Sequence, residues 1–218
     1  MWEGLSTPLH GTLVTLEPLT REHEAALFEA SRDPAVWRWL PSAGPVGADG
    51  RPGAPDRAAF TAIVEAALAA QAAGREATFV TSDRRGGGMV VGSTRYLNLR
   101  ERDRGLEIGW TWLAPVAWGT GVNVEAKLLM LAHAFDDLRC LRVEFKTDAR
   151  NERSRAALAA LPARFEGIFR RHMVVPSGIR DSAYYAVTDE DWPAVRDHLN
   201  DRLARALLRQ SISAPSRS

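Results

Sequence analysis

The chain has 218 residues, of which 45% are hydrophobic and 25% charged, and its formal net charge is +1. This composition is typical of a globular protein, and the length allows one domain with a substantial core. The balanced charge argues against a nucleic-acid partner, and no apolar run reaches the roughly 20 residues that cross a bilayer.

Hydrophobic periodicity and turn residues predict the elements of the N-terminal half. In chain order we expect a strand at 12–16, a helix at 20–31, a long Pro- and Gly-rich loop at 41–55, a helix at 56–73, and strands at 77–82, 89–98 and 105–113. Asp56 suits the N-cap of the second helix, and Gly74 its end.

The C-terminal half continues with a helix after Gly121. In it Val124, Leu128, Leu131 and Phe135 form one apolar face. There follow a strand at 141–148, a short helix at 154–161, strands at 164–174 and 182–187, and a helix from about 192 to 210. The strands on either side of the helix after Gly121 form a βαβ unit and should run parallel. The prediction is a mixed α/β fold, with an antiparallel meander before the βαβ unit, one domain over 1–210 and a flexible tail over 211–218.

Cys140 is the single cysteine, so an internal disulfide is impossible. It lies at the start of an apolar strand, where a core position is the better interpretation than a reactive thiol. The absence of disulfides and of a signal-peptide pattern leads us to expect a cytoplasmic protein.

The most informative segment is the turn between the strand at 105–113 and the helix after it. Gly119 and Gly121 open that helix, and a helix N-terminus presents unpaired N–H groups that bind anions, most often phosphate. A dinucleotide-binding turn would need a third glycine, but Val124 stands there, and a P-loop would need a Gly-Lys-Ser/Thr sequence. The turn therefore indicates a phosphate site of another family.

From about Leu9 to Leu208 the chain resembles the GNAT acyltransferase superfamily, and most of all its RimJ/RimL-type branch of ribosomal-protein N-terminal acetyltransferases. The family signature is Gln/Arg-x-x-Gly-x-Gly/Ala, and Val116 replaces its first residue. The segments that carry the resemblance are Gly119-x-Gly121, Asn123 with Glu125-Ala126-Lys127, Asn151-x-x-Ser154, Phe165-Glu166-Gly167 and Arg180-Asp181.

The resemblance implies acetyl-CoA as the acyl donor, held where the strands at 105–113 and 141–148 splay apart. An N–H group near Trp112 or Leu113 would polarise the thioester carbonyl. The acetyl-CoA-binding residues implied are Trp112, Leu113, Trp118, Gly119, Thr120, Gly121, Val122, Asn123, Asn151, Arg153 and Ser154. Within the group Arg150, Arg153 and Arg155, an arginine could reach the phosphates. No metal is implied, since no His/Cys/Asp cluster has ligand spacing.

Glu107 is the first candidate for a catalytic base, because in this family a strand glutamate at its position faces the cleft. Strand alternation places Glu107, Gly109, Thr111 and Leu113 on one face and the tryptophans on the other. A solvated strand glutamate is the competing interpretation.

Two further catalytic candidates follow from the resemblance. Many members protonate the leaving thiolate with a tyrosine, but Leu158 stands there, and the RimJ/RimL branch points instead to Ser154. Ser154 is also a good N-cap for the helix that follows it, which is the structural alternative. The branch has a glutamate where this chain has Met173, so His172 beside it becomes a second candidate base.

The leading hypothesis is an N-acetyltransferase that uses acetyl-CoA, with a protein N-terminus, a polyamine-like metabolite or an antibiotic amine as acceptor. The alternative is a non-catalytic acyl-CoA-binding or sensor module. Trp37 and Trp39 are candidates for the acceptor wall, although their spacing means that at least one is packing. The last helix either packs on the sheet or forms a homodimer.

Overall fold

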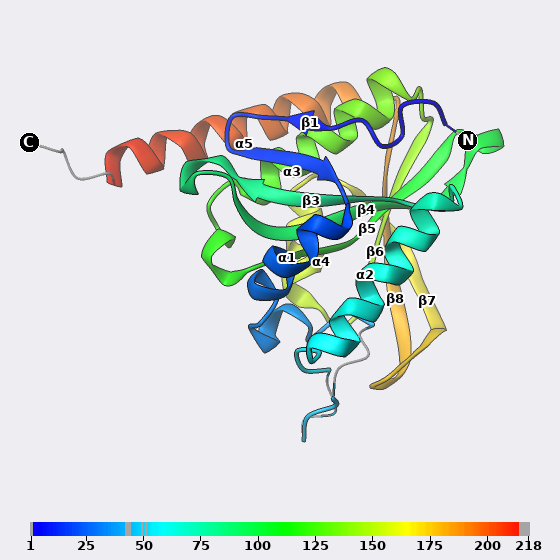
Figure 1. Ribbon diagram of the computed structural model, residues 1–218. Coiled ribbons are helices and arrows are strands. Elements are labelled where there is room, and N and C mark those ends of the chain that lie inside the picture. The colour runs from blue at the N-terminus through cyan, green and yellow to red at the C-terminus, as the bar shows by residue number, and fades with distance from the viewer. Residues whose placement is uncertain (1, 42–44, 49, 51, 214–218) are drawn as a thin grey trace, which may run out of the picture.

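The computed structural model describes residues 2–41, 45–48, 50 and 52–213, and its centre is a mixed sheet with helices on both faces (Figure 1). The strands are β1 (Leu9–His10), β2 (Val14–Pro18), β3 (Ala77–Asp83), β4 (Met89–Arg100), β5 (Gly105–Leu113), β6 (Arg142–Asp148), β7 (Arg164–Val175) and β8 (Gly178–Thr188). The helices are α1 (Glu24–Ala30), α2 (Arg57–Ala72), α3 (Val122–Ala132), α4 (Glu152–Ala159) and α5 (Trp192–Ser213).

The sheet has the order β1-β2-β3-β4-β5-β6-β8-β7. Within it β5 and β6 pair in parallel and the other neighbours pair antiparallel. This arrangement confirms the predicted meander that enters one βαβ unit. No helix in the described part of the chain is both long and apolar enough to cross a membrane.

Most element boundaries agree with the prediction. The bounds of β5 are as predicted, and the Asp56 carboxylate caps α2 by accepting from the Ala59 N–H at 2.8 Å. The two-residue strand β1 was too short to be predicted, and α5 continues to Ser213 where the tail was expected from 211. Residues 214–218 of that tail, and 42–44, 49 and 51 of the predicted loop, lie outside the described residues.

The core lies in two clusters, one on each face of the sheet. On one face α3 and α5 cover a large cluster that includes Tyr96, Met130 and Leu199. On the other, α1 and α2 cover a smaller cluster that includes Phe60. Cys140 is 2% exposed within the larger cluster, as predicted, and burial raises the pKa of its thiol to about 12.

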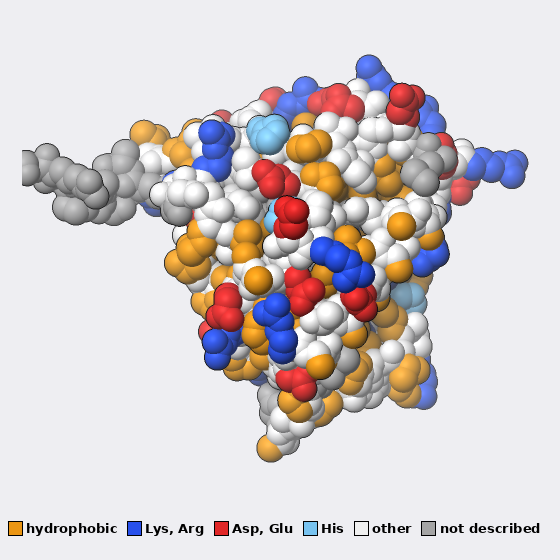
Figure 2. Space-filling model, viewed as in Figure 1, with side chains coloured by type: hydrophobic (Ala, Val, Ile, Leu, Met, Phe, Trp, Pro, Cys, Tyr) orange, Lys and Arg blue, Asp and Glu red, His pale blue; other side chains and the backbone are white. Residues whose placement is uncertain are grey.

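The packing of α5 on α3 favours the first of the two roles considered for the last helix. Its buried side chains, Trp192, Val195, Leu199 and Ala206, face the molecule. On the opposite side of the molecule, where α1 and α2 lie, acidic and basic side chains are interspersed (Figure 2).

The parallel pairing of β5 with β6 is short. It consists of three residue pairs and ends where Glu107 meets Glu144. Beyond this point β5 bends at a bulge against β4, and Trp110 in the bulge has a φ of +48°. Since bulges increase twist and redirect a strand, the second half of β5 leaves its neighbour and a gap opens in the sheet.

The bulge also overturns the predicted alternation along β5. Leu106 and Ile108 lie in the core cluster under α3, so Glu107 faces the α1 side. After the extra residue, Thr111 contacts α3 while the Trp112 ring lies 6.0 Å from that of Trp37 on the α1 side. Glu107 and Thr111 are therefore on opposite faces, because one inserted residue reverses every side chain that follows it.

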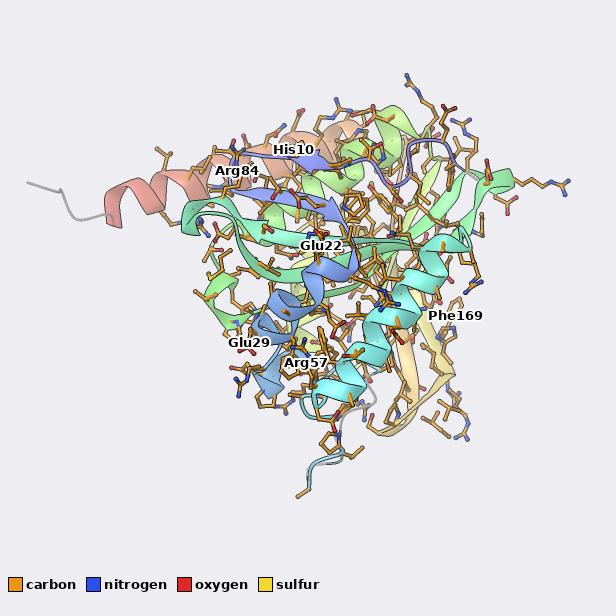
Figure 3. The ribbon with its side chains drawn as sticks, in the orientation of Figure 1. His10, Glu22, Glu29, Arg57, Arg84 and Phe169 are labelled. Carbon is orange, nitrogen blue, oxygen red and sulfur yellow. The ribbon has the colours of Figure 1, made fainter. Side chains whose placement is uncertain are left out.

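Helix α3 is tied to the N-terminal hairpin by a buried carboxylate. Glu125, 3% exposed, accepts hydrogen bonds from the backbone N–H groups of Thr12, Leu13 and Val14 at 2.7, 2.6 and 2.7 Å. Arg84 lies against the same hairpin, with its backbone N–H donating to the Leu13 carbonyl at 2.8 Å (Figure 3). The position of α3 thus depends on contacts more than a hundred residues away in sequence.

Replacing Glu125 with alanine leaves these three N–H groups without an acceptor. The N–H groups of Leu13 and Val14 are buried, and each buried donor that loses its partner costs about 1–3 kcal/mol, so we expect E125A to lower the free energy of unfolding by about 2 kcal/mol or more in urea denaturation. The exposed Glu190 provides the control, and E190Q should stay within about 0.5 kcal/mol of the parent. A loss below about 1 kcal/mol for E125A would contradict the anchoring role.

Candidate active site

A cleft of about 990 Å³ opens where β5 and β6 separate. On its α3 side the walls come from the turn after β5, the start of α3, α4 and α5. On its α1 side they include Trp39, Leu97, Glu107, Lys146 and Arg180. The cleft therefore joins the two faces of the sheet through the gap.

The N-terminus of α3 forms one end of the cleft. Gly119 and Gly121 have φ values of +73° and +88°, a region that favours glycine, and no side chain caps the helix. The first N–H groups of α3 are left for an external acceptor. The Asn123 Oδ1 atom in the cleft wall is buried and has no hydrogen-bond partner among the described residues. This end of the cleft has the features of an anion site.

Two residues that were expected to bind the acyl donor have side chains that are engaged within the protein. The Val122 side chain is fully buried in the core, and the Thr120 hydroxyl donates to the Ala117 carbonyl at 2.7 Å. Val116, at the position of the family's Gln/Arg, is 65% exposed.

Of the three predicted arginines, the structure brings one into the cleft. Arg153 stacks on the Trp118 ring, with its guanidinium carbon 3.7 Å from the ring centroid. Arg150 instead bonds Asp148, and Arg155 bonds the Tyr185 hydroxyl. Helix α5 supplies three more arginines to the wall that the sequence did not suggest, and their spacing along one helix face is the signal for them: Arg202, Arg205 and Arg209.

The backbone of β5 offers one of the two predicted N–H groups to the gap. The Ala114 N–H donates to Val91 of β4 at 2.7 Å, and strand geometry turns the N–H of Trp112 the same way. The N–H and the carbonyl of Leu113 then both face the gap, because they lie on the same edge of the strand. The Leu113 carbonyl accepts there from the Trp118 indole at 2.7 Å. Trp112 therefore cannot serve through its amide, because β4 lies on that side.

Asn151, not Ser154, caps α4. The Asn151 Oδ1 atom accepts from the Ser154 N–H at 3.1 Å, and the helix begins at Glu152. The prediction of Ser154 as the N-cap was wrong because the helix starts two residues earlier than expected. The Ser154 side chain lines the cleft.

Glu107 is buried in the cleft wall and is 2% exposed, so the alternative of a solvated strand glutamate was wrong. Its Oε2 atom accepts from the Asn98 Nδ2 at 2.6 Å and lies 3.4 Å from the Lys146 Nζ. These two partners hold the carboxylate in place.

His172 does not line the cleft, although its neighbour Met173 does. Its Nδ1 lies 3.0 Å from the Ser182 hydroxyl and its Nε2 3.3 Å from the Tyr184 hydroxyl. Burial lowers the pKa of His172, and the charge of Lys146 lowers it further, so the imidazole is neutral at neutral pH. Its placement does not favour the role of catalytic base.

Lys127 is a buried amine in the cleft wall, and the sequence placed it in a family segment without indicating that it belongs to the site. Its Nζ donates to the Thr111 hydroxyl at 2.7 Å and to the Thr94 hydroxyl at 3.3 Å, and no carboxylate of the described residues pairs with it. Burial lowers its pKa to about 7. The sequence contained one sign of this burial, which is that Lys127 lies three residues after Val124 on the apolar face of the helix. A buried amine that titrates near neutrality is typical of functional sites.

The two tryptophans before the loop have different surroundings. Trp37 is 1% exposed and donates from its indole to the Ser31 carbonyl, so it is a packing residue. Trp39 lines the cleft. This confirms that at least one of them packs.

A family model for the acetyltransferase (GNAT) domain matches residues 14–163. The chain belongs to the GNAT acetyltransferase family.

Several GNAT relatives are similar over most of the chain. A GCN5-related N-acetyltransferase from Brucella melitensis is 29% identical, with a TM-score of 0.81 over 91% of this chain and 86% of that one. Mycobacterium smegmatis RimJ, solved in complex with CoA-disulfide, is 25% identical, with a TM-score of 0.72 over 89% of this chain and 92% of that one.

Curated relatives agree with this result. The FsC-acetyl coenzyme A-N(2)-transacetylase of Aspergillus fumigatus is 27% identical over 84% of this chain and 77% of its own. A Bacillus subtilis protein, YdaF, whose name proposes a ribosomal N-acetyltransferase, is 30% identical over 48% of this chain, and the match spans 57% of that protein. The chain is therefore similar to the RimJ/RimL-type branch.

Lys127 should titrate near pH 7 in this GNAT fold. The chain contains two lysines, so lysine selectively labelled with carbon-13 gives two side-chain signals in an NMR titration. We expect one to change from its charged shift below pH 7 to its neutral shift above it, because burial disfavours the ammonium form. K127M should remove that signal and leave the one from Lys146. If the lost signal instead titrates above pH 9.5, the proposed environment of Lys127 is wrong.

Proposed function

We propose that this protein is an acetyl-CoA-dependent N-acetyltransferase that transfers an acetyl group to a primary amine. The observation that carries the proposal is the cleft, which connects the uncapped N-terminus of α3 to the buried Glu107 on the other face of the sheet. Membership of the GNAT family supports acyl transfer as the reaction class.

The residues on the α3 side fit an acyl-CoA. The N–H groups from Gly119 to Asn123 would hold the pyrophosphate. The Asn123 Oδ1 atom, buried without a partner among the described residues, is an acceptor available to an N–H or O–H group elsewhere on the bound molecule. Arg153 and Arg205 add positive charge along the wall. The Leu113 N–H at the open edge of β5 would bond the pantetheine arm as a neighbouring strand does. When bound, acetyl-CoA supplies an acetyl group activated as a thioester.

Residues on the two sides of the cleft take different proton-transfer roles. Glu107, held by Asn98 and Lys146, accepts the proton of the substrate ammonium directly or through a water molecule. The Ser154 hydroxyl is the candidate proton donor on the opposite side, and the Lys127 Nζ is a second group there that can hold or release a proton near neutral pH.

Turnover on an amine panel tests the proposal. We expect CoA release from acetyl-CoA with at least one free-amine peptide, diamine or small amine, and binding of acetyl-CoA in calorimetry without any acceptor. Binding without release of CoA on every member of the panel would overturn the enzyme assignment and leave a non-catalytic acyl-CoA-binding module.

Glu107 gives a residue-specific test. E107Q keeps the shape and the neighbours of the side chain but removes its basicity, so we expect kcat to fall about 100-fold, the usual contribution of a positioned base. The dissociation constant for acetyl-CoA should stay within about twofold, because Glu107 lies on the α1 side of the gap. A kcat within about threefold of the parent would exclude Glu107 as the base.

A further inference from the structure

Arg180 occupies an unusual position for a charged side chain. It lies on β8 opposite Met173 of β7, and it is 6% exposed. It lines both the main cleft and a neighbouring cavity of about 200 Å³, so it stands in the wall that the two share. A cation here is almost removed from bulk solvent but open to the interior of the site.

The guanidinium of Arg180 has no anionic partner in the described chain. Its Nε is buried without a hydrogen-bond partner, and no carboxylate oxygen of the described residues lies within the 4.0 Å of an ion pair. The nearby carboxylates are already engaged. Arg150 bonds both oxygens of Asp148, at 3.0 and 2.9 Å, and Asn98 and Lys146 hold Glu107.

A buried cation without a counter-ion is energetically costly, and proteins retain such groups where they meet a ligand. Burial lowers the pKa of Arg180 although Asp148 and Glu107 raise it, which agrees with a missing partner. An anion placed in the shared wall would remove this cost.

The smaller cavity also has an excess of positive charge among its lining residues. Among its described lining residues Arg38, Arg150 and Arg180 are basic and Asp148 is acidic. Trp39 and Pro41 line both this cavity and the main cleft, which also contains Glu107. One molecule could therefore place an anionic group at Arg180 and an amine near Glu107.

We infer that the acceptor is an amine that carries a carboxylate, and that Arg180 binds this carboxylate and so orients the amine toward Glu107. A planar guanidinium fork matches a carboxylate through two parallel hydrogen bonds. The inference rests on the proposed function. The inferred acceptors include free amino acids as well as peptides with an acidic side chain close to their N-terminus, because both present an amine and a carboxylate.

Matched amine pairs test the inference. The small-molecule arm compares β-alanine, 4-aminobutyrate and 5-aminovalerate with their primary amides, and the peptide arm compares Ala-Asp with Ala-Asn, both amidated at the C-terminus. In at least one pair we expect kcat/KM to favour the acid by about tenfold or more, the size of a charge-assisted hydrogen bond. The arm in which the preference appears identifies the source of the carboxylate.

Three variants separate binding from structure. R180Q should reduce the acid-to-amide ratio to near one by raising KM for the acid while the amide is unaffected, and R180K should retain part of the preference. R170Q removes an exposed arginine from the same β7–β8 hairpin and should keep the parent ratio. A change in melting temperature without a change in the ratio would overturn the inference.

A binding measurement makes the result independent of turnover. In nitrogen-15-labelled protein, the Nε–H signal that R180Q removes should shift on titration with butyrate, which has no amine, and should not shift with butyramide. If butyrate shifts this signal while no amine is acetylated, the carboxylate site stands and the proposed function fails. If amides are acetylated as well as acids and the signal does not move, the function stands and the inference fails.

Discussion

The structure depends on one constraint, which is that β5 and β6 pair over only three residues. A parallel pair joined through α3 would normally continue and close the sheet. Here the bulge at Trp110 turns β5 away, so that backbone groups beyond Glu107 face a gap instead of a neighbouring strand. Buried backbone groups require partners, and in the function proposed above the acyl donor provides one. The gap is thus both an incomplete sheet and the opening that connects the two faces.

Helix α3 links the stability of the fold to the geometry of the site. Its first turn provides uncapped N–H groups at the end of the cleft, its second turn provides Lys127 beside Thr111, and between them Glu125 fixes the helix to the N-terminal hairpin. Sites held by rigid elements keep their geometry within narrow limits. A single helix anchored near its start can therefore position the glycine turn that precedes it relative to the splayed strands.

The α1 side of the cleft has a different character, because the charged side chains of Glu107, Asp148 and Arg180 are buried there. Glu107 and Lys146 satisfy each other, and Arg150 satisfies Asp148. Arg180 has no such partner in the described chain. Where most local rules are obeyed, the exception is the place to look for function, and this one lies in the wall between the α1 side of the cleft and the smaller cavity.

The sequence by itself determined the order of the elements, the bounds of β5, the cap at Asp56 and the glycine turn before α3, because these follow from periodicity and from local turn and cap chemistry. It could not predict the bulge at Trp110, so it assigned Glu107 and Thr111 to the same face. It proposed Ser154 as a cap because it placed the start of the helix two residues too late, and Asn151 is the cap in the structure. The roles of Glu125, Lys127 and Arg180 required the tertiary structure. Their surroundings are built by residues far along the chain, as in the bond from Thr12 to Glu125 across 113 positions, and a local pattern has no information about such partners.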